Sequence, residues 1–549
     1  MFLFVTIITA AQGAFFQTKN SLESSDYISN YLKGSLSLNY NNYRDANFFF
    51  SKTRNLANSH SSYDFQYIYS LVMEGKISEA NKLINKTDEK NQFLFKLIQG
   101  VYYIKNRNYF EAKKVFEKSN KQNSLLDELN NYINLWIDIS FQDTDNEEYK
   151  IQQFNSSFSN IKLIQSFLIY DFTSNKKGYD KTSQLILNQP TLGRYHFFHT
   201  IHLVKKKQYS EAEIILQKQL FYSPDDLLLR QGYVALKNKN FAFFTKKFDS
   251  QNINHTISEL LYLFANLFQQ QGQIDLSQLI ASLSDYLNPN FVTNKLLNFE
   301  NIILSKEISF ENTNTKLIAD LGSEFKWYIN FNQLRSQKLE NGAIKNLENM
   351  IAQDKYFRFS KLMDMGNYYR GNKNFKLALE YYLKAEAIGS SNELDWKIYY
   401  YMGICYERLG QYENADREFR LSLKLSPSQY AVINYLAYSW LERGVNLQES
   451  KQMLEKAVQL SKWNQGYIID SLGWAYYLLN DFSEAEKLLQ LAYEKAPQES
   501  EVYDHYGDVL WKNNKKIQAR YVWKNATKLP NIETERLNKI KKKLLHGIQ

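Results

Sequence analysis

The sequence is poor in the residues that punctuate or cross-link a fold. Among its 549 residues there is one cysteine, Cys405, which excludes an internal disulfide framework and a cysteine-based zinc site. There are six prolines and 20 glycines, and this scarcity argues against a turn-rich β architecture. We therefore expect a helical chain in which Cys405 is a buried packing thiol.

The sequence also lacks a strong charge bias. Its 67 basic and 58 acidic residues leave a net charge of +9, whereas nucleic-acid-binding proteins usually concentrate positive charge on one element. We therefore predict no nucleic-acid partner. No stretch after the N-terminal segment reaches the roughly 18 uninterrupted apolar residues that a membrane helix needs, so no other transmembrane span is expected.

Motifs for catalysis or cofactor binding are absent as well. The sequence contains no HExxH, P-loop, GxSxG or CxxC in a workable context, so we predict no enzyme activity, no metal and no cofactor. One histidine row, His196, His199 and His202, has a spacing that places the three rings on one side of a helix. Basic residues flank this row and no carboxylate is in reach on the same face, so a structural role is favoured over a metal site.

What the sequence does contain is a pattern repeated from about Leu362 to Leu529. The small residue that opens the second half of each copy recurs in steps of 34 to 37 residues. These small residues are Ala343, Ala378, Ala415, Ser450, Ala485 and Ala519. A period near 34 with this pattern resembles the tetratricopeptide repeat, a helix–turn–helix unit.

The pattern also has a physical reading. Each half of a copy carries apolar residues at helical spacing, so each half is an amphipathic helix. We expect Gly403 to face Ala415, and Gly473 to face Ala485, because small side chains let two helices approach closely. Prolines such as Pro427 and Pro497 then end the pairs. One pair cannot bury its own apolar face, so the pairs stack into an all-α superhelical solenoid, which the resemblance implies is right-handed.

The chain is expected to form one continuous solenoid, since no Pro-, Gly- or Ser-rich linker interrupts it. We predict eroded repeats over 15–120, irregular helical pairs over 121–345 and well-formed repeats over 346–530. The last segment, 531–549, reads as an amphipathic basic helix that caps the solenoid. Contact of this helix with an anionic membrane or RNA is the alternative.

The N-terminal segment 1–14 is an apolar run that ends in small residues, which resembles a secretory signal peptide. No Lys or Arg precedes its apolar core, so the alternative that it forms a first buried helix stays open. We expect an exported, periplasmic protein, with a cytoplasmic protein as the alternative.

The candidate binding residues follow from repeat geometry. The first helix of each pair is expected to line a concave groove, with positions i, i+4 and i+7 pointing inward. Selected on this basis are Asn367, Arg370, Tyr400, Glu407, Asn434, Tyr438, Asp470, Trp474, Tyr477, Asp504, Asp508 and Trp511. Trp474 and Trp511 each have an acidic neighbour, and aromatic anchors beside charge are typical of a binding surface. Simple solvation of a polar helix face is the alternative, and an acid/base pair of Asp504 and Asp508 is disfavoured.

Four C-terminal segments carry a more specific resemblance, to an alphaproteobacterial family of exported tetratricopeptide-repeat proteins. These segments are Tyr435–Trp440, Gly466–Tyr477, Asp504–Trp511 and Ala519–Trp523. The resemblance implies the fold and an envelope location, without a substrate. We expect a scaffold that binds a protein or peptide carrying Lys or Arg, in envelope assembly or maintenance. The alternative is a binder of envelope polysaccharide or peptidoglycan, with Trp474, Tyr477 and Trp511 stacking on sugars.

Overall fold

The structure is a computed structural model. It describes residues 25–54, 62–87, 92–117, 125–141, 147–154, 156, 158–304, 321–336, 341–390, 394–530 and 532–548. The segment 1–14, predicted to be a signal peptide, lies outside these residues. Every regular element within them is a helix, without a strand. The predicted fold class, an all-α solenoid of paired helices, is therefore confirmed.

The chain forms two compact units, Met1–Gln337 and Lys338–Gln549, rather than the single continuous stack that we expected. The division falls inside the segment 121–345, and the domain boundaries given above stay a prediction. The helices of the first unit are α2 (Ser25–Asn39), α3 (Tyr43–Ser51), α4 (Tyr63–Met73), α5 (Ile77–Ile84), α6 (Phe93–Lys105), α7 (Tyr109–Glu117), α8 (Leu125–Phe141), α9 (Glu147–Gln153), α10 (Ser159–Phe172), α11 (Lys176–Leu187), the short 3-10 helix η3 (Pro190–Leu192), α12 (Gly193–Lys205), α13 (Tyr209–Tyr222), α14 (Leu227–Lys237), α15 (Ala242–Lys247), α16 (Ile253–Gln270), α17 (Ile274–Leu287), α18 (Val292–Leu304) and α20 (Ser323–Ser336).

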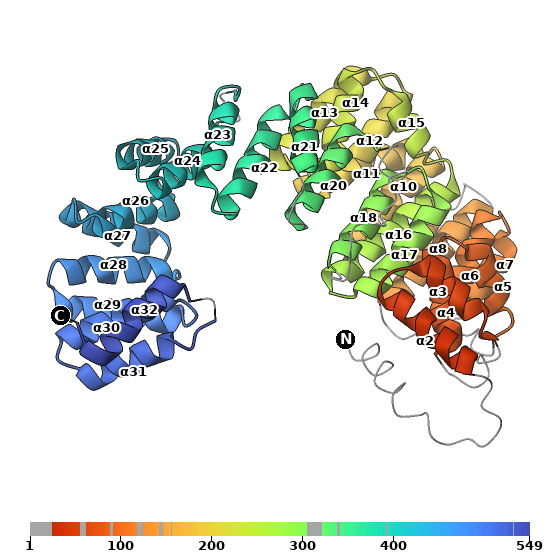
Figure 1. Ribbon diagram of the computed structural model, residues 1–549. Coiled ribbons are helices and arrows are strands. Elements are labelled where there is room, and N and C mark those ends of the chain that lie inside the picture. The colour runs from red at the N-terminus through yellow and green to blue at the C-terminus, as the bar shows by residue number, and fades with distance from the viewer. Residues whose placement is uncertain are drawn as a thin grey trace. The chain divides into compact units, whose positions relative to one another are not determined.

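The second unit is a regular succession of helix pairs from α22 to α31, preceded by α21 and followed by α32 (Figure 1). It contains α21 (Asn341–Gln353), α22 (Arg358–Gly371), α23 (Phe375–Glu386), α24 (Trp396–Arg408), α25 (Tyr412–Leu425), α26 (Tyr430–Glu442), α27 (Leu447–Leu460), α28 (Gly466–Leu478), α29 (Phe482–Lys495), α30 (Ser500–Lys512), α31 (Lys516–Ala526) and α32 (Thr534–His546). From α22 to α31, each helix packs mainly against its neighbours in sequence, as expected for a stacked repeat.

Proline and glycine fix the geometry of each pair. The prolines Pro224, Pro289, Pro427 and Pro497 each stand two residues after the end of a second helix, where a residue without a backbone N–H is tolerated. The side chain nearest to Gly403 is that of Phe419 rather than Ala415, and the one nearest to Gly473 is that of Leu489 rather than Ala485. A methyl group added to Gly403 would lie 2.5 Å from Phe419 Cε1. The same sixteen-residue offset recurs at Gly366–Tyr382, Gly473–Leu489 and Gly507–Trp523. The glycine thus makes room for a large side chain one turn beyond the alanine.

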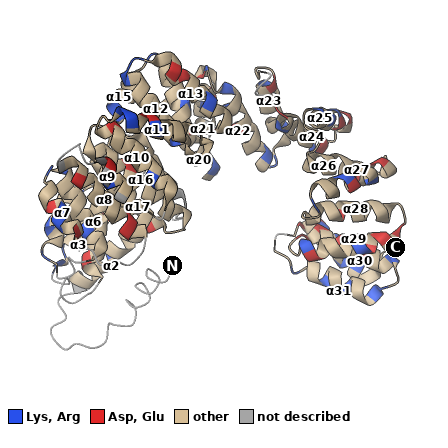
Figure 2. Ribbon diagram, turned by 180° about the vertical axis from the view of Figure 1, so that it is seen from behind, with Lys and Arg blue, Asp and Glu red and all other residues tan. Residues whose placement is uncertain are grey.

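Charged residues of both signs are interspersed along the helices of each unit. Figure 2 shows short blue and red segments scattered among the tan ones on the helices of both units. This pattern is typical of solvated helix faces.

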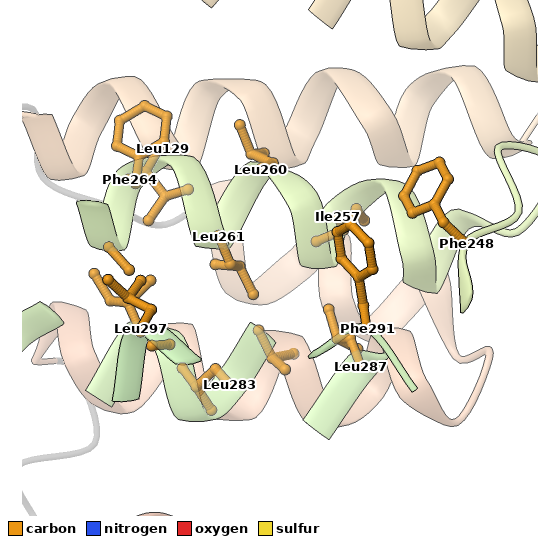
Figure 3. Close-up of a cluster of buried hydrophobic side chains, with 14 of the residues drawn as sticks. Leu129, Phe248, Ile257, Leu260, Leu261, Phe264, Leu283, Leu287, Phe291 and Leu297 are labelled. Carbon is orange, nitrogen blue, oxygen red and sulfur yellow. The ribbon is translucent and has the colours of Figure 1, made fainter. Parts of the chain in front are cut away.

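In the first unit, α16 and α17 pack on helices that precede them in the chain and fill the inner side of the stack. Helix α17 packs on α4 and α6, and α16 packs on α8 and α10. The contact between Tyr69 Oη and Gln278 Oε1, at 3.3 Å, joins residues 209 positions apart. Figure 3 shows Leu260, Leu261 and Phe264 of α16 among the apolar side chains of neighbouring helices. The face that the first helices of this unit share is therefore part of a core.

A buried ion pair joins α16 to α12. Arg194 Nε and Nη2 donate to the two carboxylate oxygens of Glu259, at 2.7 and 2.6 Å. Glu259 is fully buried, and Arg194 also lies over the Tyr262 ring, 3.7 Å from its centroid. Because both oxygens are satisfied and the guanidinium is stacked, this pair can be accommodated in an apolar interior.

Candidate functional site

The candidate residues lie on the first helices of the second unit, α22, α24, α26, α28 and α30. We call the side of these helices that carries them the first-helix face. Helix α28 contacts both α26 and α30, so these three first helices are neighbours although a second helix separates each from the next in sequence. The local cause is the amphipathic pattern, which buries one stripe of each helix against its second helix.

At the N-terminal end of this face, Arg370 organises a small polar cluster. Its Nε donates to Tyr382 Oη at 3.1 Å, and Tyr382 Oη donates to Asn367 Oδ1 at 2.8 Å. The guanidinium lies over the ring of Tyr401, 4.3 Å from its centroid. The predicted pair Asn367 and Arg370 is thus brought together, half-buried, between α22, α23 and α24.

Helices α24 and α26 meet through aromatic side chains. The Tyr400 ring contacts Tyr435 edge to face, with 5.9 Å between centroids, and Tyr435 Oη donates to Glu407 Oε2 at 3.3 Å. Tyr400, Glu407 and Tyr435 are all half-buried. This part of the face is therefore an aromatic surface with one carboxylate beside it.

A stack of three rings links α28 to α30. Trp474 stacks on Tyr477 at 4.5 Å and on His505 at 4.1 Å between centroids, with the rings nearly parallel. His505 Nδ1 lies 2.9 Å from Asp470 Oδ2. Burial lowers the pKa of His505, but the carboxylates of Asp470 and Glu501 outweigh it and raise this pKa to about 9. His505 therefore carries a proton at neutral pH.

Asp504 and Asp508 are not exposed to a partner, which corrects the prediction of an open acidic pair. Their exposed fractions are 7% and 6%. Lys543 Nζ, from α32, lies 2.6 Å from Asp504 Oδ1 and 2.8 Å from both carboxylate oxygens of Asp508. Trp523 Nε1 donates to Asp508 Oδ1 at 3.2 Å. Burial and the charge of Asp504 raise the pKa of Asp508 to about 6, and Lys543 opposes this rise.

Glu501 is a second point at which α32 meets this face. Arg536 Nη2 and Tyr438 Oη donate to Glu501 Oε1, at 2.8 and 2.9 Å. Burial would raise the pKa of Glu501, but His505, Arg536 and the Tyr438 hydroxyl together hold it below its ordinary value. Tyr438 is thus tied to α30 across α28.

The remaining predicted residues are also engaged by the chain itself. Trp511 is half-buried beside Trp523, with 5.6 Å between ring centroids, and Arg520 lies over its ring. Asn434 and Asp470 are buried, yet their Oδ1 atoms have no hydrogen-bond partner among the described residues. The placement of Asn434, Asp470, Asp504 and Asp508 in an open groove was therefore wrong, while their role in binding stays a prediction.

Sequence reasoning missed four residues that organise this face: Glu501, His505, Arg536 and Lys543. Glu501 precedes Asp504 by one helical turn, so the inward spacing already pointed to it. His505 lies next to Asp504 but joins the face through Asp470 on another helix. Arg536 and Lys543 belong to the segment interpreted as a cap, and nothing in their local pattern named the carboxylates that they meet.

The charge on His505 gives a pH prediction for the second unit. Its pKa is raised to about 9 from an ordinary value of 6.5, so the folded state holds this proton more tightly than the unfolded chain does. The stabilisation is complete below about pH 6.5 and is lost as the pH rises to about 9. We expect the urea midpoint to fall over this window, and to fall less in His505→Gln. Parallel curves for the two proteins would contradict the assignment.

The histidine row of the first unit is structural in its contacts. Tyr179 Oη lies 2.7 Å from His199 Nδ1, and His196 Nε2 lies 2.9 Å from Ile186 O. His202 Nδ1 lies 2.7 Å from Asp171 Oδ1 on α10. A carboxylate from another helix is therefore in reach of the histidine row, although none lies beside it on α12. Within the described residues, no three His, Cys, Asp or Glu side chains gather as a metal site would require.

None of the helices described is both long and apolar enough to cross a lipid bilayer.

Comparison with known proteins agrees with the repeated pairs. The family model of the tetratricopeptide repeat matches residues 396–429, which hold α24 and α25. A TPR repeat-containing protein of Pseudomonas aeruginosa is 26% identical over 114 residues, a match that spans 21% of this chain and 19% of that protein.

Solved structures of lower identity are also similar to part of the chain. A thermophilic TPR protein from Thermus thermophilus is 16% identical, with a TM-score of 0.30, over 34% of this chain and 99% of its own. MamA from Desulfovibrio magneticus is 19% identical, with a TM-score of 0.28, over 31% of this chain and 94% of its own. The chain thus contains a tetratricopeptide repeat at 396–429, on one of the successive helix pairs from α22 to α31.

Proposed function

We propose that this protein is a non-enzymatic scaffold that binds a protein partner through the first-helix face of the second unit. The observation that carries the proposal is the composition of that face. Tyr400, Tyr438, Trp474 and Tyr477 are all half-buried there, and large rings that keep part of their surface in water are the anchors of protein interfaces.

A polar group on the same face supports a peptide as the ligand. Glu407 is half-buried beside the Tyr400 and Tyr435 rings, and a carboxylate next to aromatic anchors suits a peptide that carries Lys or Arg. Sugar stacking is less well supported, because the Trp474 ring already stacks on Tyr477 and His505.

The proposal includes an envelope location, which follows from the apolar run at 1–14 and from the family resemblance of the C-terminal segments. Fusion of residues 1–30 to an export reporter tests the location separately from binding. A reporter that stays in the cytoplasm would remove the envelope role and leave the scaffold role.

Position-specific crosslinking in the native organism tests the binding face. We expect a photoreactive residue at Tyr400 to form protein adducts, because Tyr400 lies on the first-helix face. The matched control is Tyr521, a tyrosine on the second helix α31 that is 65% exposed. Adducts at Tyr400 and none at Tyr521 support the proposal. Equal adducts at both positions, or glycan adducts at Tyr400, contradict it.

A further inference from the structure

Helix α32 lies along the acidic part of the first-helix face with a matched spacing of charges. Its Arg536 and Lys543 are seven residues apart, two helical turns, and so are the Glu501 and Asp508 that they meet on α30. The pairing runs in the same direction along both helices. Two basic side chains on one side of α32 therefore pair with two carboxylates at the same spacing on α30.

The N-terminal end of α32 reaches the opposite end of the same unit. Glu533, the residue before α32, has its Oε1 atom 3.4 Å from Nζ of Lys373, which follows α22. Burial lowers the pKa of Arg408, but Tyr435, Glu407 and, more weakly, the same Glu533 carboxylate outweigh it and raise this pKa. The segment thus extends from the first of the five pairs to the last, across the face to which we assign binding.

The contacts that hold α32 combine ion pairs with a small apolar cluster around Ile540. Ile540 is its one fully buried residue, and Leu545 is 73% exposed. By contrast, α16, which fills the inner side of the first unit, buries ten residues, most of them apolar. Burial of apolar surface is the main favourable contribution to the packing of a helix. Helix α32 buries less of it than α16 does, so we expect α32 to be held less tightly.

We infer that the acidic side of α30, on the first-helix face, is a receptor for a basic amphipathic helix, and that α32 occupies it until a partner helix of the same charge pattern replaces it. The inference rests on the proposed function and adds the class of partner and its regulation. The partner segment carries two cationic side chains two turns apart with an apolar residue between them, as Arg536, Ile540 and Lys543 do.

The covalent linkage makes α32 a strong competitor even though it buries little apolar surface. A tethered segment acts at an effective concentration of the order of millimolar, so a partner with equal contacts has to exceed that level or carry additional ones. Because the anchors are charged, added salt weakens both the internal and the external ligand. The arrangement keeps the acidic residues paired while no partner is bound.

A labelled peptide of residues 532–548 serves as the probe, and the full-length chain as its receptor. Arg536→Glu with Lys543→Glu in the chain sets like charges against Glu501, Asp504 and Asp508, which should release α32. We expect the peptide to bind this variant at least tenfold more tightly than it binds the wild-type chain. Hydrogen exchange should show released amides in α32 with α22–α31 still protected.

The matched control is Lys541→Glu with Lys542→Glu, which makes the same charge change at two exposed positions of α32. This control should bind the peptide as the wild type does. If the double variant fails to fold, Lys543→Gln tests the same release with a smaller perturbation. Equal peptide affinity for wild type and variant overturns the inference and leaves the Tyr400 crosslinks, and with them the proposed function, intact. Absence of Tyr400 crosslinks in both proteins instead overturns the proposed function.

Discussion

Replacement of Glu259 with alanine is expected to lower the stability of the first unit by about 3–5 kcal/mol. The substitution leaves the Arg194 guanidinium buried against Tyr262 without the carboxylate that accepts from its Nε and Nη2. A buried cation without a partner is far more costly than a pair that was never formed. The loss should appear as a lower urea midpoint and faster hydrogen exchange in α16 and α12.

Two further variants make this prediction specific. Glu213→Ala removes a carboxylate from an ion pair with Lys237 on the surface of the same unit, and no measurable change is expected because water screens that pair. Arg194→Met combined with Glu259→Leu removes both charges and should recover most of the stability. A double variant as unstable as Glu259→Ala would show that packing, rather than the unpaired charge, is responsible.

Trp523→Ala is expected to cost about 3–5 kcal/mol in the last repeat of the second unit. The Trp523 side chain is fully buried, fills the space left by Gly507 and donates to Asp508. Its removal leaves a large cavity between α30 and α31 and also takes away the apolar support of Ile540 on α32.

Because stacked repeats contact mainly their neighbours, this loss should remain local. Hydrogen exchange should rise in α30, α31 and α32, while α22–α25 keep the protection of the wild type. Tyr521→Ala, on the same helix but 65% exposed, should leave all of these rates unchanged. Equal loss of protection along the whole second unit would contradict the local character of the repeat.

The paired helices of the second unit could be predicted from sequence because their causes are local. A period near 34, amphipathic halves and prolines after the second helix each act within one repeat. The contact of Gly403 with Phe419 was missed for a similarly local reason: the helices cross one turn away from the assumed point. Only the crossing geometry, which the spacing of small residues does not fix, decides which side chain the glycine meets.

The packing of α16 and α17 on earlier helices of the first unit could not be predicted from local patterns. The same holds for the ion pairs between α32 and α30. The pattern of α16 is that of any repeat helix, and its packing on α8 depends on how far the stack curls. In α32 the spacing of Arg536 and Lys543 is visible in the sequence, yet several acidic rows have a similar spacing. Three-dimensional placement, rather than residue type, selected Glu501, Asp504 and Asp508.

The contact between Tyr69 and Gln278 has a consequence for synthesis of the chain. A ribosome adds about 5–20 residues per second, so α17 follows α4 after roughly 10–40 s. During this interval the apolar sides of α4, α6 and α8 remain uncovered, because α16 and α17 have not yet been synthesised. Such surfaces are prone to association with other chains. We therefore expect the first unit to expose apolar surface for longer during translation than the pairs from α22 to α31, each of which can dock on the pair just completed.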